Sequence, residues 1–138
     1  MKILIDTNIV LDHLLDRSPF NTAAKWIFSE TEKGNLTTFM GGTTVTTVHY
    51  LITKAIGSKE SRIAIEQLLR LFDVAPITRT ILASALMLKF NDFEDAVLHE
   101  AAIHAGAQAI ITRDIKGFQK ATIAVYSADE FVISQYSD

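Results

Sequence analysis

Three absences narrow the classes of protein to which this sequence can belong. Its 138 residues include no cysteine, which excludes disulfide bonds, a thiolate metal site and a cysteine nucleophile. No apolar run approaches the ~20 residues needed to cross a bilayer, and no basic segment followed by an apolar core opens the chain. We therefore expect a soluble, cytoplasmic protein with no membrane partner.

Positive charge is also scarce, because 13 Lys and Arg stand against 16 Asp and Glu, for a formal net charge of −3. This balance argues against a general nucleic-acid coat protein. It does not exclude a metal-dependent nuclease, whose site is acidic until cations fill it. With 49% hydrophobic residues, the chain can bury a full core, and one domain covering residues 1–138 is expected.

Short apolar runs alternate with segments of helical periodicity along the chain. The first strand covers residues 3–5, and further strands are expected at 36–40, 72–75, 108–112 and 123–126. Helices are expected at about 9–15, 22–33, 44–56, 58–71, 78–88, 93–105 and 127–136. This alternation predicts an α/β fold with a mostly parallel central sheet of about five strands, flanked by helices on both faces.

Acidic residues stand where these elements begin and end. Asp6 ends the first strand, Asp114 follows strand 108–112, and the segment Asp92-Phe93-Glu94-Asp95 opens a helix. Ligands of open α/β sheets bind beyond the carboxyl ends of the strands, so these acids are expected to face one cleft. Asp92 and Asp95 share a helical face, whereas Glu94 is expected to project elsewhere.

Clustered carboxylates repel one another, and hard divalent cations make such an arrangement tolerable. Because cysteine is absent, Mg²⁺ or Mn²⁺ is the expected metal. A simpler interpretation remains for Asp6, since Asp is a common helix cap and the next residues, Thr7 and Asn8, can also cap.

Three motifs contain these acids: IDTNIVLD at the N-terminus, DFEDAVLHEAA in the middle and AIITRD near the C-terminus. In this order they resemble the PIN-domain family of metal-dependent ribonucleases, which includes VapC-type toxins. The resemblance implies that Asp6, Asp95 and Asp114 are catalytic and hold Mg²⁺ or Mn²⁺, with Asp92 as an auxiliary metal residue. It also implies RNA hydrolysis to 5′-phosphate and 3′-hydroxyl products, a homodimer and, for toxin members, an antitoxin partner.

One position departs from the family pattern. Family members usually place a glutamate early in the helix after the second strand, in a run similar to T-x-x-E-x-x-Y. Here the run is Thr44 to Tyr50, and Thr47 occupies the glutamate position. A hydroxyl brings no charge, so weaker metal binding or a substitute ligand is expected. His49 could substitute, but it points to another side of the helix and imidazole is a poor Mg²⁺ ligand, which favours a structural role.

Several polar residues next to the acids are expected to support them or to contact substrate. By the resemblance, Thr112 occupies the hydroxyl position beside the last acid, while Arg113 either touches a substrate phosphate or is a plain exposed arginine. Asp12 flanks the cleft or is solvated, and His99 is expected to be buried and hydrogen-bonded rather than a ligand. The supporting set is Asn8, Thr47, Thr112 and Arg113. Two basic groups are candidate phosphate contacts, Lys54 with Lys59 and Arg62, and Lys116 with Lys120.

Two other functions stay open on the sequence. A PIN-like domain without the usual glutamate could bind RNA or a protein without cutting. A Mg²⁺-dependent phosphatase could use Asp6 as a covalent nucleophile. Haloacid-dehalogenase-like phosphatases usually have a second Asp two residues later, where this chain has Asn8, which argues against that class.

Overall fold

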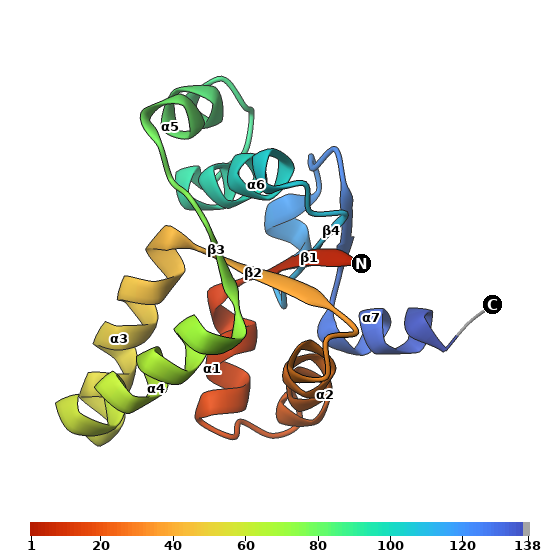
Figure 1. The fold of residues 1–138 in the computed structure, drawn as a ribbon. Coiled ribbons are helices and arrows are strands. Elements are labelled where there is room, and N and C mark those ends of the chain that lie inside the picture. The colour runs from red at the N-terminus through yellow and green to blue at the C-terminus, as the bar shows by residue number, and fades with distance from the viewer. Residues whose placement is uncertain (137–138) are drawn as a thin grey trace.

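A five-stranded sheet with the order β3-β2-β1-β4-β5 forms the centre of the computed structural model, which describes residues 1–136 (Figure 1). All four strand pairings are parallel, which confirms the expected α/β class. Parallel strands need crossover connections, and helices provide them here. The strands are β1 (Lys2–Ile5), β2 (Thr37–Gly41), β3 (Asp73–Ala75), β4 (Ala109–Ile111) and β5 (Ala124–Tyr126).

Seven α-helices cover the two faces of the sheet in the described part of the chain. Figure 1 shows α5 and α6 on one face and α1 to α4 on the other. No helix among residues 1–136 is both long enough and apolar enough to span a bilayer. The helices are α1 (Thr7–Leu14), α2 (Asn21–Glu32), α3 (Gly42–Ile56), α4 (Ser58–Leu71), α5 (Arg79–Leu86), α6 (Phe93–Ala105) and α7 (Ala128–Gln135).

Successive side chains of each strand enter two different cores, because side chains alternate along a strand. Ile3 and Ile5 of β1 pack with α1, α2 and the Phe131 side of α7, whereas Leu4 packs with α5 and α6. These three β1 side chains are fully buried, whereas Lys2 at the start of the strand is exposed. Burial on both faces explains why β1 and β4 are continuous apolar runs rather than alternating ones.

The order in which the chain adds strands reverses at β1, and this places the carboxyl ends of β1 and β4 side by side. The chain moves from β1 outward to β2 and β3, then returns to add β4 and β5 on the opposite side of β1. Ile5 is in register with Ile111, so β1 and β4 end at the same level. The residues that follow the two strands, Asp6 and Thr112, are consequently neighbours at the edge where α/β proteins bind ligands.

Candidate active site

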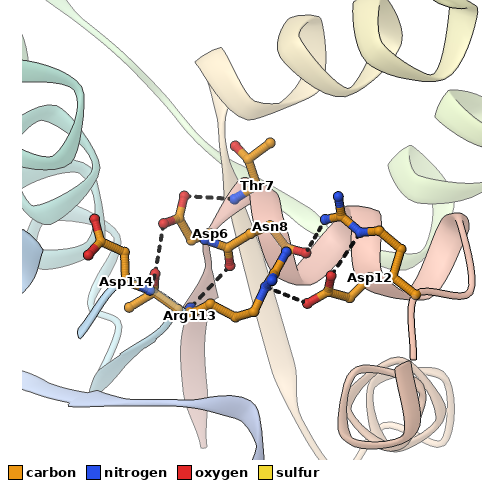
Figure 2. Close-up of polar contacts among 8 residues, drawn as sticks. Asp6, Thr7, Asn8, Asp12, Arg113 and Asp114 are labelled. Atoms are coloured by element: carbon orange, nitrogen blue, oxygen red, sulfur yellow. Dashed lines mark hydrogen bonds and ion pairs between the residues drawn. The ribbon is translucent and has the colours of Figure 1, made fainter. Parts of the chain in front are cut away.

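Asp6 lies at the junction of β1 and α1 and is 8% exposed. One carboxylate oxygen accepts the Thr7 backbone N–H at 2.7 Å, and the other accepts the Thr112 hydroxyl at 2.9 Å (Figure 2). Asp6 is therefore itself the N-cap of α1, rather than Thr7 or Asn8. Burial raises the pKa of Asp6, the bonds from Thr112 and Thr7 oppose this, and the charges of Asp114 and Asp92 raise it further.

The segment after β4 links Asp6 to Asp114. The Thr112 side chain is fully buried. Its hydroxyl group donates a hydrogen bond to Asp6 and accepts one from the Asp114 backbone N–H at 3.0 Å. Asp114 then caps a single 3₁₀ turn, η1 (Ile115–Phe118), by accepting the Gly117 N–H at 3.1 Å. Figure 2 shows the carboxylates of Asp6 and Asp114 on the same side of this segment.

The third acid comes from the start of α6. Asp92 caps this helix, with one carboxylate oxygen accepting the backbone N–H groups of Glu94 and Asp95 at 2.8 and 3.4 Å. Burial raises the pKa of Asp95 to about 7, and the charges of Asp6, Asp92, Asp114 and Glu94 contribute in that order. A carboxyl group whose pKa responds to two acids from other segments, Asp6 and Asp114, lies in the same electrostatic environment as they do.

Gly117 shows how closely two of these carboxylates approach. A Cβ atom at Gly117 would lie 2.5 Å from Oδ2 of Asp114 and 2.7 Å from Oδ2 of Asp95. The two oxygens therefore lie no further apart than the sum of those distances. A methyl group at this position would force one or both carboxylates to move, so the absence of a side chain at Gly117 allows their close approach. The sequence analysis did not identify Gly117, although a glycine three residues after a site acid was the available signal.

The carboxylates of the candidate site are suitable ligands for a hard divalent cation, but their present positions do not complete its coordination. Carboxylate oxygens are the ligands that Mg²⁺ and Mn²⁺ prefer. Burial and then neighbouring carboxylates raise the pKa values of Asp6 and Asp95, so a nearby cation would favour their ionised forms. In the described part of the chain, however, no three Asp, Glu or His side chains surround one point closely enough for direct metal coordination.

Glu94 was expected to project away from the other acids, and the direction of its side chain stays a prediction. Burial raises its pKa, and the charges of Asp92 and Asp6 raise it further. Charges interact beyond contact distance, so this coupling does not require the side chain to point at the other acids. Glu94 is thus part of the electrostatic environment of the acids.

The start of α3 approaches Asp6 through hydroxyl groups. Thr44 is fully buried, and its hydroxyl lies 3.1 Å from that of Thr7, the residue after Asp6. Thr47 is half-buried and donates its hydroxyl to the Thr43 carbonyl of its own helix at 3.0 Å. The backbone carbonyl of His49 accepts hydrogen bonds from the Thr53 and Ser61 side chains. That Thr47 stands in for a glutamate therefore stays a prediction.

Asn8 and Arg113 fasten α1 to the segment that contains Asp114. The Arg113 backbone N–H donates to the Asn8 side chain at 3.2 Å. The Arg113 side chain turns away from the acids, where Nε lies 3.1 Å from the Asp12 carboxylate and the guanidinium stacks on Phe20 at 4.1 Å. Arg113 is accordingly neither an unattached surface arginine nor aimed at the three acids.

Asp12 is the buried centre of this network, which Figure 2 shows between two arginines. It is 0% exposed, and its other oxygen receives Nε of Arg17 at 3.0 Å. Burial raises the pKa of Asp12, while Arg113 and then Arg17 lower it. The sequence did not single out this burial, although Asp12 lies three residues after Ile9 on the apolar face of α1.

Two further features lie outside the acid cluster. His99 of α6 is buried and hydrogen-bonded as expected, with Nε2 accepting the Thr122 N–H and Nδ1 lying 3.0 Å from Glu100. A cavity of about 570 Å³ between α1, α2 and α4 includes His13 and Phe28 in its lining and none of the site acids. The acids lie instead on an open edge of the sheet.

Comparison with protein families gives the same assignment as the fold. A model of the PIN domain matches residues 2–116. This match covers most of the sequence, so the chain belongs to the PIN-domain family. A comparison with curated proteins finds no match.

Solved structures of toxin–antitoxin proteins share this fold. A chain of VapBC2 from Rickettsia felis, crystallised with a DNA fragment from its promoter, has a TM-score of 0.70 and 13% identity over 92% of this chain and 98% of that one. A toxin–antitoxin complex from Klebsiella pneumoniae has a TM-score of 0.70 and 22% identity over 91% and 97%. The sarcin-ricin loop cleaving toxin VapC20 from Mycobacterium tuberculosis has a TM-score of 0.68 and 15% identity over 88% and 96%. At these identities the likeness concerns the fold.

Proposed function

We propose that this protein is a Mg²⁺- or Mn²⁺-dependent endoribonuclease that hydrolyses RNA phosphodiester bonds. The observation that supports this most is the electrostatic coupling of acids from three separate segments: beyond the effect of burial, the charges of Asp6 and Asp114 raise the pKa of Asp95, and the charge of Asp114 raises the pKa of Asp6. Mutual repulsion of this kind costs stability in the metal-free protein, and binding of a cation offsets it. Membership of the PIN family is consistent with this chemistry.

Each residue of the site then has a definable task. Asp6, Asp95 and Asp114 would hold the cation, while Thr112 orients Asp6 through its hydrogen bond. Asp92 fixes the start of α6, and its charge lies close enough to Asp6 and Asp95 to affect both. A bound divalent cation would lower the pKa of water and polarise the phosphodiester. Both oxygens of Asp6 accept hydrogen bonds, from Thr7 and from Thr112, and this lowers their nucleophilicity. The arrangement therefore favours a cation ligand over the covalent nucleophile of a phosphatase.

The test is incubation of the purified chain with labelled RNA and Mg²⁺ or Mn²⁺. We expect cleavage that stops in chelator and in Asp6→Asn, Asp95→Asn and Asp114→Asn, each of which should remain folded by circular dichroism. Asp73→Asn is the matched control, because Asp73 is an exposed acid on β3. Equal cleavage by Asp6→Asn and the parent chain would remove the basis of the proposal.

A second candidate is a PIN domain that binds RNA or a protein without cutting it. The observation in its favour is Thr47, whose hydroxyl is occupied by its own helix and supplies no charge. In the same assay this function predicts a gel shift of intact RNA at every metal concentration. Hydrolysis of a small phosphomonoester, abolished in Asp6→Asn, would instead favour the phosphatase.

We further propose that the chain is the toxin of a toxin–antitoxin pair and forms a homodimer. The support for the toxin is that structures of the same fold come from toxin–antitoxin proteins. The homodimer is what the resemblance to the PIN-domain family implies. Expression of the chain alone should slow bacterial growth, and Asp114→Asn should relieve this. Sedimentation of the purified chain as a monomer would contradict the dimer.

A further inference from the structure

Three lysine residues line a small surface depression of about 10 Å³, which we call the hollow, beside the candidate active site. Lys89 comes from the loop between α5 and α6, Lys116 from η1, and Lys120 from the turn that follows η1. The hollow also includes Gly117, the residue whose backbone lies against the carboxylates of Asp95 and Asp114. The positive hollow and two of the three acids therefore meet at one residue.

These lysines are not used by the fold. All three are exposed, and within residues 1–136 none of their ammonium groups forms a hydrogen bond or an ion pair. Of the described residues that line the hollow, none is acidic. Four other cations are paired with carboxylates, namely Arg17, Lys33, Arg70 and Arg113.

Aromatic packing fixes the two segments that carry the lysines. Phe90, next to Lys89, packs edge-on against Phe118 with ring centroids 6.1 Å apart, and against His99 at 5.2 Å. Phe118 is 1% exposed and closes η1, which contains Lys116. Because the partly buried ring of Phe90 packs on the buried ring of Phe118, the spacing between the lysine backbones is set by the core rather than by flexible loops.

We propose that this hollow binds the backbone phosphates of single-stranded RNA next to the bond that is cut. The inference rests on the proposed nuclease function. A chain of net charge −3 with an acidic site repels RNA, so unpaired cations at the edge of that site are needed to hold the strand. Lysine supplies such contacts as a point charge, without reading the base sequence.

The salt dependence of RNA binding tests the proposal. The variant Lys89→Gln/Lys116→Gln/Lys120→Gln is compared with a matched control, Lys2→Gln/Lys25→Gln/Lys33→Gln, which removes three exposed cations from β1, α2 and the residue that follows α2. Binding of a fluorescein-labelled single-stranded oligoribonucleotide is followed by anisotropy in Mg²⁺ between about 50 and 200 mM KCl. Gels verify that the probe stays intact, and a series in EDTA gives a cleavage-independent measurement.

Three lost phosphate contacts on a single strand lower the slope of log K against log salt by about 2, and weaken binding on the order of 100-fold at ~0.1 M salt. The control should change the slope by less than half as much. A single-stranded DNA probe of the same sequence shows whether the hollow binds RNA or any phosphodiester backbone. If the hollow variant loses affinity for the DNA probe alone, the assignment to RNA is overturned.

The outcomes separate this inference from the nuclease proposal. If RNA is cleaved but the hollow variant keeps the parent slope, the phosphate site is wrong and the nuclease stands. If no metal supports cleavage yet the slope falls in the hollow variant alone, the phosphate site stands and the nuclease falls. Equal slopes in the two triple variants, or no RNA binding by the parent chain, would overturn the phosphate site.

Discussion

Replacing Asp12 with alanine should destabilise the protein far more than removal of an ordinary charged residue. The carboxylate is fully buried and lies 3.0 Å from Nε of Arg17 and 3.1 Å from Nε of Arg113. Removing one partner of a buried pair costs ~3–5 kcal/mol, because it leaves uncompensated charge. The arginine side chains here are 37% and 33% exposed, so they can regain water, and we expect about 3 kcal/mol, near the lower limit.

Urea unfolding provides the measurement. Trp26 is the only tryptophan and packs against Phe131, with centroids 6.3 Å apart, so its fluorescence reports loss of the core. With a denaturant slope of ~2 kcal/mol/M, the midpoint should fall by about 1.5 M in Asp12→Ala. Glu66→Ala is the matched control, because its ion pair with Arg70 is exposed on both sides and is worth below ~1 kcal/mol. An Asp12→Ala midpoint equal to that of Glu66→Ala would refute the role of the network.

Three further predictions concern the acids. The raised pKa of Asp95, about 7, means that the metal-free folded chain keeps a proton which the unfolded chain releases near pH 4. Its stability should therefore fall as pH rises from about 4 to 7 and then level off, while Mg²⁺ affinity rises over the same interval; a flat profile in EDTA, or one unchanged in Asp95→Asn, would count against this. Thr47→Glu should lower the metal concentration needed for half-maximal cleavage. His49→Ala is measured beside it, because His49 is the other residue that could substitute for the glutamate. If calorimetry shows unchanged metal binding in Thr47→Glu, then Thr47 does not occupy the glutamate position. Gly117→Ala should push the carboxylates of Asp95 and Asp114 apart. It should therefore weaken Mn²⁺ binding clearly while the melting temperature changes little. Unaltered Mn²⁺ binding would mean that the close approach of the two carboxylates at Gly117 is not needed.

Much of the fold followed from the sequence, because each element has a strong local signal. The apolar runs before Asp6 and Asp114 predicted two adjacent buried strands, and β1 and β4 are paired in the structure. The glycines that end α3 and α6 marked those helix ends correctly. A single 3₁₀ turn such as η1 has no hydrophobic period, which is why it was not expected.

The environment of the site was harder to predict, because it depends on contacts between distant segments. Asp12 and Arg113 are separated by most of the chain, and no local pattern shows that they form an ion pair. The apolar period of α1 does place Asp12 on the buried face, so its burial was open to inference while its partners were not. The supporting position of Thr112 was predicted, and its hydrogen bond to Asp6 shows the geometry that makes support possible.

The shared cation site of Asp6, Asp95 and Asp114 is the central claim, and a crystal soaked in Mn²⁺ tests it most directly. The anomalous signal of manganese locates the ion without reference to any assumed ligand. We predict one peak at the sheet edge with carboxylate oxygens of all three residues, directly or through water, and direct metal–oxygen distances of ~2.0–2.6 Å. Asp6→Asn crystals treated in the same way should lose the peak. A manganese peak remote from these three residues, or the same peak retained in Asp6→Asn, would contradict the account.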